Sequence, residues 1–157
     1  GHLSWQRGEG LRRHGLQGSV EPLAEQLQQA PLPSPSGRRV AYATLEPSGG
    51  NIWLLEGQSP VRLVPNIAGV GCLRFSQDEE SLLWIGGRNG EVAGIHRVNL
   101  SSEEAQDHCV VNCNMRTGNV EASRMLALPL SCESIAWDAQ QIRWTDAYGE
   151  EHEARLP

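Results

Sequence analysis

This sequence contains no lysine, and it also has no long apolar run and no signal peptide. All 13 basic residues among the 157 are arginine, and the formal net charge is −6. This acidic balance argues against nucleic acid or an anionic membrane as the main partner. No apolar run approaches the ~18 residues of a transmembrane helix, and no secretory signal peptide opens the chain. Membrane contact is therefore expected only through a removed N-terminal anchor.

Motifs of known catalytic sites are missing too. The chain has no Gly-x-Ser-x-Gly, and no Ser or Cys lies in a recognisable nucleophile context. The glycine-rich stretch 86–90 lies between two predicted strands, whereas a phosphate loop needs an adjacent helix N-terminus. The acidic run 78–80 occupies a predicted tight turn, where a solvated surface is expected rather than paired catalytic carboxylates. We predict no enzyme activity and no cofactor.

Four cysteines are present, an even number that permits two disulfides in three pairings. The spacing of Cys109 and Cys113 is typical of a small disulfide loop, and the neighbouring His108 leaves zinc or copper as a weak alternative. For Cys72 and Cys132, a disulfide and two buried thiols both remain open. Four cysteines together with the missing lysines favour an exported bacterial domain, periplasmic or extracellular, and four reduced thiols in a cytosolic domain are the alternative.

The N-terminal part predicts one helix. Residues 1–2, Gly-His, are interpreted as a tag remnant, which leaves residues 3–157 as a single domain. A stripe of apolar residues at helical spacing predicts a helix over 16–30, after a frayed segment 7–18. The stripe consists of Leu16, Val20, Leu23, Leu27 and Ala30. The prolines that follow from residue 31 end the helix.

Short strands and turns are predicted from residue 38 onward. Asn89-Gly90 is a strong turn signal, because both residues tolerate positive φ. A polar, acidic stretch within 101–114 is interpreted as an insertion. The three predicted hairpins pair 40–45 with 51–55, 81–85 with 92–100, and 141–145 with 150–156.

These hairpins belong to a repeat. The segments 30–42, 72–84 and 132–144 align without gaps, and each ends in an aromatic residue. Asp78 matches Asp138, with Ser36 in the first copy, and Cys72 matches Cys132. A period near 40 residues with about four strands per unit is typical of β-propeller blades.

The segments 33–42 (PSPSGRRVAY), 51–55 (NIWLL) and 60–63 (PVRL) resemble the TolB-type, WD-like β-propeller repeat. A second copy ends at residue 100, so two repeats cover 31–100, and a degenerate third copy covers 115–157. The sequence departs from the pattern at Ser36, where the repeat has Asp, and at Glu79, where it has Gly.

The resemblance implies a mainly β fold of antiparallel hairpins and a non-catalytic binding or sensor domain of a membrane-anchored bacterial protein. A protein partner is expected, and strand edges left open by only three repeats favour association, including homo-oligomers. The strand tryptophans are expected to fill the core. They are Trp53, Trp84, Trp137 and Trp144.

A minor pilin or pseudopilin is the alternative. Proteins of that class, in type IV pili and type II secretion systems, resemble this layout of a helix, an antiparallel sheet and a cysteine-bearing tail. This interpretation predicts an α+β fold with one continuous helix over 3–30 packed on a single sheet. It accounts for the chain length without further blades, and it accounts less well for the repeat.

Overall fold

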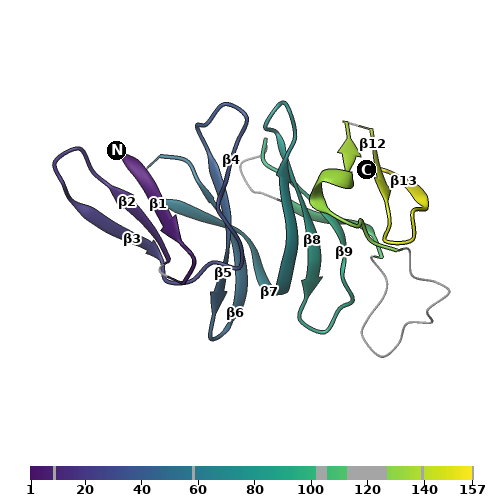
Figure 1. Ribbon diagram of the computed structural model, residues 1–157, viewed down its shortest axis with the longest axis horizontal. Helices are drawn as coiled ribbons and strands as arrows, with labels where there is room; N and C mark the ends of the chain where they lie inside the picture. Colours follow the sequence, from purple (N-terminus) through teal and green to yellow (C-terminus); the bar gives the residue numbers. More distant parts are fainter. Residues whose placement is uncertain (9, 58, 102–105, 113–126, 139, 157) are drawn as a thin grey trace. The chain divides into compact units, whose positions relative to one another are not determined.

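The computed structural model describes residues 1–8, 10–57, 59–101, 106–112, 127–138 and 140–156. Strands dominate (Figure 1), and the helical element of this part of the chain is a single 3₁₀ turn, Cys132–Ser134. No helix within it is long and apolar enough to cross a membrane. The chain divides into two compact units, Gly1–Ile67 and Ala68–Pro157.

The first unit begins with a three-stranded antiparallel meander. It consists of β1 (His2–Gln6), β2 (Gly10–His14) and β3 (Val20–Ala24). His2, which was set aside as a tag remnant, is the first residue of β1, and its ring stacks on that of His14 with centroids 4.6 Å apart.

The helix predicted over 16–30 is absent, and so is the frayed segment before it. Gly18 has φ 85°, and the N–H of Gly15 donates to the carbonyl of Ser19 at 2.8 Å, so the chain turns back here into β3. Leu16 is 93% exposed, whereas Leu23 and Leu27 pack on the core. The apolar spacing therefore did not mark one buried face, and the helix required by the pilin alternative is missing.

The second sheet region of this unit confirms the first predicted hairpin. It contains β4 (Leu32–Pro33), β5 (Val40–Glu46), β6 (Gly49–Leu55) and the first half of β7 (Pro60–Phe75), in sequential antiparallel order. Its core cluster centres on Leu11, Tyr42 and Leu55, which join the meander to this hairpin.

In the second unit, the other half of β7 is followed by β8 (Ser81–Arg88), β9 (Gly94–Asn99) and β10 (Gln106–Val111). The predicted hairpin of 81–85 with 92–100 is confirmed, and Gly90 adopts φ 85° at its turn. Part of the predicted insertion 101–114 is strand β10, which pairs with β9.

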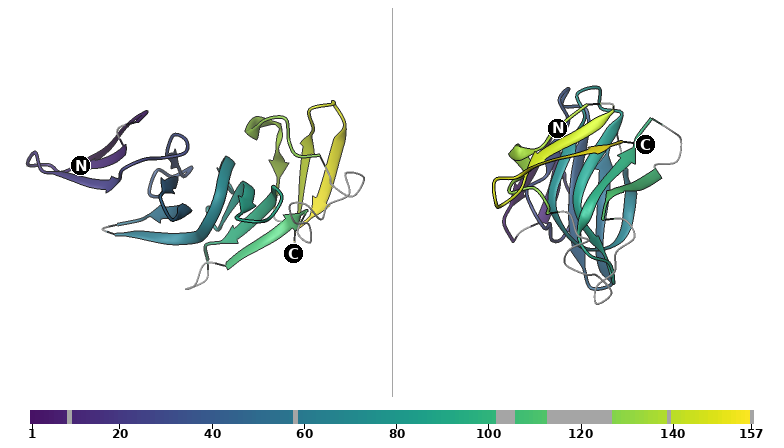
Figure 2. Two further views of the ribbon diagram at one scale, coloured as in Figure 1. Left: turned by 90° about the horizontal axis from the view of Figure 1, so that it is seen from below. Right: turned by 90° about the vertical axis from the view of Figure 1, so that its right-hand side faces the viewer.

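A separate three-stranded sheet completes this unit (Figure 2). It consists of β11 (Ala136–Trp137), β12 (Gln141–Thr145) and β13 (Glu151–Arg155), and it confirms the third predicted hairpin. Ile142 and Trp144 of this sheet pack with Leu83, Ile85 and Ile95 of β8 and β9 in one core cluster.

Two of the three aligned segments form equivalent turns. The N–H of Ser34 donates to the carbonyl of Arg39, and the N–H of Ser76 donates to the carbonyl of Ser81, each at 2.9 Å. Positive φ recurs at the same place, 79° at Gly37 and 61° at Glu79. The aromatic residues that end the three segments, Tyr42, Trp84 and Trp144, are 1%, 0% and 2% exposed.

Candidate functional site

The cysteines form disulfides. Cys72 and Cys132 are joined, with Cα atoms 5.4 Å apart, so the bridge ties β7 to the segment that precedes β11. Of the two alternatives for these cysteines, the disulfide is therefore the one observed, and the two buried thiols are not. Cys109 is disulfide-bonded as well, and Cys113 lies outside the described residues. Because a cysteine in a disulfide offers no thiolate, the weak metal reading of His108 and Cys109 loses its sulfur ligand.

A pocket of about 410 Å³ lies at the turn ends of the second unit. We call it the turn pocket. Its wall comes from the β7–β8 turn, the end of β9 and the turn after β11. The lining residues are Ser76, Gln77, Asp78, Glu80, Ser81, Arg97, Asn99, Ser101, Trp137 and Asp138. Three of these side chains are carboxylates and one is a guanidinium, so the pocket carries an excess of negative charge.

Asp78 and Asp138, the two repeat-equivalent carboxylates, both line the turn pocket. Each fixes its own turn through Oδ1. Asp78 accepts from the hydroxyl of Ser76 at 2.5 Å and the N–H of Glu80 at 3.0 Å. Asp138 accepts from the N–H groups of Gln140 at 2.8 Å and Gln141 at 3.0 Å. The second oxygen of each carboxylate takes no part in these bonds.

The same hydrogen bonds keep both groups ionised. The Ser76 hydroxyl, followed by the Glu80 N–H, lowers the pKa of Asp78. The N–H groups of Gln140 and Gln141 lower the pKa of Asp138. The solvated turn predicted for residues 78–80 is present, whereas the sequence did not predict that Asp78 and Asp138 line the same pocket.

Trp137 supplies an aromatic wall to this pocket. Its side chain is half-buried, and it packs at the edge of the core cluster while lining the cavity. The expected core role therefore describes only part of its environment. Arg74 fixes the segment in front of it, since its guanidinium donates to the carbonyls of Cys132, at 3.2 Å, and Ile135.

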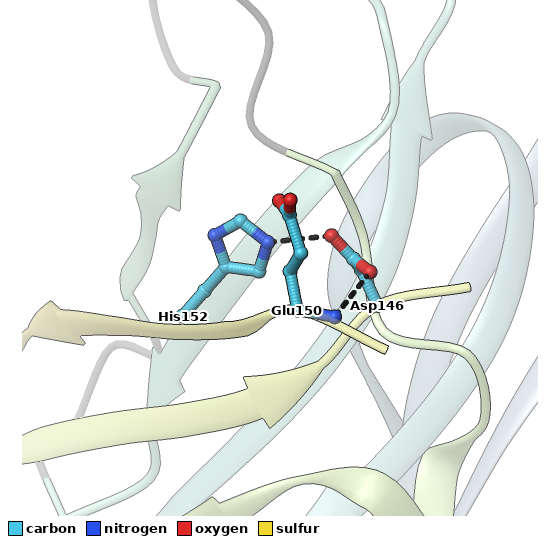
Figure 3. Close-up of side chains that lie close together, drawn as sticks. All are labelled: Asp146, Glu150 and His152. Atoms are coloured by element: carbon cyan, nitrogen blue, oxygen red, sulfur yellow. Dashed lines mark hydrogen bonds and ion pairs between the residues drawn. The ribbon is translucent and has the colours of Figure 1, made fainter. Parts of the chain in front are cut away.

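A second polar cluster gathers at the β12–β13 turn (Figure 3). One ligand-type atom from each of Asp146, Glu150 and His152 lies within 4.8 Å of the other two. Asp146 is 1% exposed, and its Oδ1 accepts from the N–H groups of Tyr148, at 2.8 Å, and Glu150, at 3.0 Å. Its Oδ2 lies 2.7 Å from Nε2 of His152.

Packing and hydrogen bonds hold Asp146 and His152 in place. The His152 ring stacks on Trp144 with centroids 5.4 Å apart, and the two residues are cross-strand partners. The hydrogen bond with His152, and then those from the Glu150 and Tyr148 N–H groups, lower the pKa of Asp146 against the opposing effect of burial. Neither the histidine nor this carboxylate was singled out from the sequence.

The repeat places an equivalent cluster on β8–β10. Trp84 pairs across strands with His96, and their rings stack with centroids 4.0 Å apart. Nε1 of Trp84 donates to Asp107 at 2.9 Å, and Arg88 forms an ion pair with Asp107 at 2.8 Å. Nδ1 of His96 lies 3.5 Å from the same carboxylate, and both side chains are 6% exposed.

Burial raises the pKa of Asp107, but His96, Trp84 and Arg88 together lower it by more. In this second cluster the carboxylate is surrounded by the indole N–H of Trp84, the ring of His96 and the guanidinium of Arg88. Its histidine is 6% exposed, against 19% for His152, and we therefore take the turn pocket and the Asp146 cluster as the candidate sites.

Comparison with solved structures identifies proteins of similar fold. No protein-family model and no curated protein sequence matches the chain. TolB from Acinetobacter baumannii superposes with a TM-score of 0.52 at 14% identity, over 96% of this chain and 39% of TolB. The β-propeller domain of the trilobed protease from Pyrococcus furiosus superposes with a TM-score of 0.53 at 16% identity, over 97% of this chain and 56% of that one.

This chain therefore spans between two fifths and just over half the length of these structures. At such identities the superpositions establish the fold alone. They agree with the antiparallel hairpins described above. The chain has a TolB-like fold of the β-propeller type.

Proposed function

We propose that this chain is a non-catalytic, extracytoplasmic protein-interaction domain that binds a basic segment of a partner protein in the turn pocket. One observation carries the proposal: Asp78, Asp138 and the ring of Trp137 line the same cavity of about 410 Å³. A cationic side chain entering it would meet carboxylate oxygens on two sides and an aromatic face.

The chemistry favours arginine over lysine as the inserted side chain. A planar guanidinium binds carboxylates through two parallel hydrogen bonds and also stacks on aromatic rings. A cation over an indole face gains about 0.5–2 kcal/mol, depending on desolvation. The net charge of −6 would steer such a partner toward the domain.

The disulfide supports the proposed location. Structural disulfides persist in the periplasm and outside the cell, and are rare in the cytosol, and Cys72–Cys132 is one by its place in the core. The non-catalytic role rests on the absence of catalytic motifs from the sequence. A sensor role, association between copies and attachment to a membrane stay predictions.

The test is a titration of the whole chain with an arginine-rich hexapeptide, followed by tryptophan fluorescence and calorimetry. We expect a dissociation constant on the order of 10–100 µM and no binding of a glutamate-rich hexapeptide. Asp138→Asn keeps an acceptor for the turn but removes the charge, and should weaken binding about tenfold.

Glu133→Gln is the matched control, because Glu133 is an exposed carboxylate outside the pocket. It should leave the affinity for the arginine peptide unchanged. Equal affinity for both peptides, or equal losses in the two variants, would reduce the effect to net charge and overturn the proposal.

A further inference from the structure

The β12–β13 turn carries a set of side chains that the proposed function does not use. Asp146, Glu150 and His152 lie within a seven-residue stretch and bring together two carboxylates and one imidazole. We propose that they form a binding site for a divalent transition-metal ion, with zinc as the best match to this set of ligands.

The donor atoms fit such an ion. Zinc binds histidine nitrogen and carboxylate oxygen at about 2.0–2.2 Å, so two ligand atoms on one ion lie about 3 Å apart. Nε2 of His152 and Oδ2 of Asp146 are 2.7 Å apart, which needs only a small opening. On binding, the ion takes the place of the proton between them, and the proton leaves Nε2 for Nδ1 or for solvent.

Neighbouring groups in the fold also hold the Asp146 and His152 side chains in position. Two backbone N–H groups hold Oδ1 of Asp146 and leave Oδ2 directed at the imidazole. Stacking on Trp144 fixes the plane of the His152 ring. In known metal sites, such contacts orient the side chains that bind the metal, and their loss typically weakens metal affinity 10- to 100-fold.

The equivalent cluster on β8–β10 supplies an independent argument. There, the guanidinium of Arg88 neutralises Asp107. In the β12–β13 cluster, a second carboxylate, Glu150, lies beside Asp146, and the side chain that contacts Asp146 at 2.7 Å is the imidazole of His152. Two carboxylates facing one imidazole leave a negative charge that a divalent cation would balance.

Access from solvent is present. A cavity of about 460 Å³ borders His152 and Trp144, although Asp146 and Glu150 do not line it. The side chain of His152 is 19% exposed and Glu150 is exposed, so an ion can enter and retain water at its open positions.

The test is isothermal titration of the EDTA-treated whole chain with zinc chloride in a non-chelating buffer. We expect one zinc per chain and a raised melting temperature in its presence. Glu150→Gln alters an exposed side chain and should weaken zinc binding at least tenfold, and His152→Gln should abolish it.

Glu133→Gln is the matched control, because it removes the same charge from an exposed residue that lies outside the cluster and outside this cavity. It should leave the affinity within twofold of the wild type. Absence of zinc binding at millimolar zinc would overturn the proposal. So would equal affinity in Glu150→Gln and the wild type, or binding that survives in His152→Gln and thus belongs to other histidines such as the stacked pair His2 and His14.

Discussion

The Trp84–His96–Asp107 cluster and the Trp144–His152–Asp146 cluster contain the same three side-chain types, in two sheets of one unit. In both, tryptophan and histidine are cross-strand partners whose rings stack. In the first, the indole N–H donates to the carboxylate itself. In the second, the indole N–H donates to the carbonyl of Ala127, and backbone N–H groups hold the carboxylate.

This difference separates a structural cluster from a candidate binding site. Each oxygen of Asp107 accepts a hydrogen bond from a side chain, Oδ1 from the indole N–H of Trp84 and Oδ2 from the guanidinium of Arg88. Asp146 has one oxygen held by the turn and the other beside a single imidazole. The Asp107 cluster thus includes the cation Arg88, whereas the Asp146 cluster includes a second carboxylate, Glu150.

The largest expected effect is on the Asp107 cluster. Trp84→Ala should lower the free energy of unfolding by about 3–5 kcal/mol, the usual loss for a buried aromatic residue, because Trp84 is 0% exposed. It also takes a donor from buried Asp107. Trp144→Ala should cost less, since its N–H partner is a backbone carbonyl. Urea unfolding followed by circular dichroism measures both; a larger loss in Trp144→Ala would reverse the ranking of the two clusters.

Removing the Cys72–Cys132 bridge should act mainly on the β11–β13 sheet. The two cysteines are 60 residues apart, and the loop-closure relation gives a loss of about 4 kcal/mol. The double variant Cys72→Ala with Cys132→Ala should speed hydrogen exchange at Ile142 and Trp144 more than at Leu83 and Ile85. Equal acceleration in both sheets would show that the bridge does not act locally.

The contribution of Asp107 to stability should depend on pH, because its pKa is lowered in the folded protein. A carboxyl group whose pKa is lower in the folded protein adds stability above its ordinary pKa of about 3.9, and this contribution is lost as the pH falls toward the folded value. Asp107→Asn should therefore cost about 1–3 kcal/mol at pH 7, and the difference from wild type should shrink below pH 4. Melting temperatures from pH 7 to pH 2 test this, with Glu133→Gln as a control that should follow the wild type; a gap that stays constant with pH would contradict it.

The smallest effect is expected at the turn that leads into β8. Glu79 has φ 61° where the first repeat has Gly37 at 79°. A left-handed backbone conformation costs a non-glycine residue about 1–2 kcal/mol. Glycine removes this strain, but part of the gain is offset because glycine has more conformational entropy to lose when the chain folds. Glu79→Gly should thus raise stability by about 0.5–1 kcal/mol, read from the urea midpoint. Ala in place of Glu79 is the control and should bring no gain; a gain equal to that of glycine would exclude backbone strain as the cause.

Much of the β architecture could be predicted from local turn chemistry. The sequence Asn89-Gly90 and the spacing of the aromatic residues led to the correct hairpins, because such turns depend on neighbouring residues alone. The prediction of a helix over 16–30 was wrong because of local turn chemistry as well. Gly15 and Gly18 form a turn that competes with a helix, and spacing alone does not tell which leucines are buried.

The candidate sites depend on contacts that are distant in sequence. The repeat alignment matched Asp78 with Asp138, yet their convergence on one pocket requires equivalent turns of successive blades to be neighbours. Trp144 and His152 meet only through the register of β12 and β13. A search for histidines opposite the repeated tryptophans would have found this pair.

A double-mutant cycle on the turn pocket tests the central claim most directly. Calorimetry would compare binding of the arginine hexapeptide to wild type, Asp78→Asn, Asp138→Asn and the double variant. If both carboxylates contact the same inserted cation, the losses from the single changes should not add, with a coupling of at least about 0.5 kcal/mol. Strictly additive losses, or binding indifferent to either aspartate, would contradict the claim that repeat-equivalent carboxylates form one binding site.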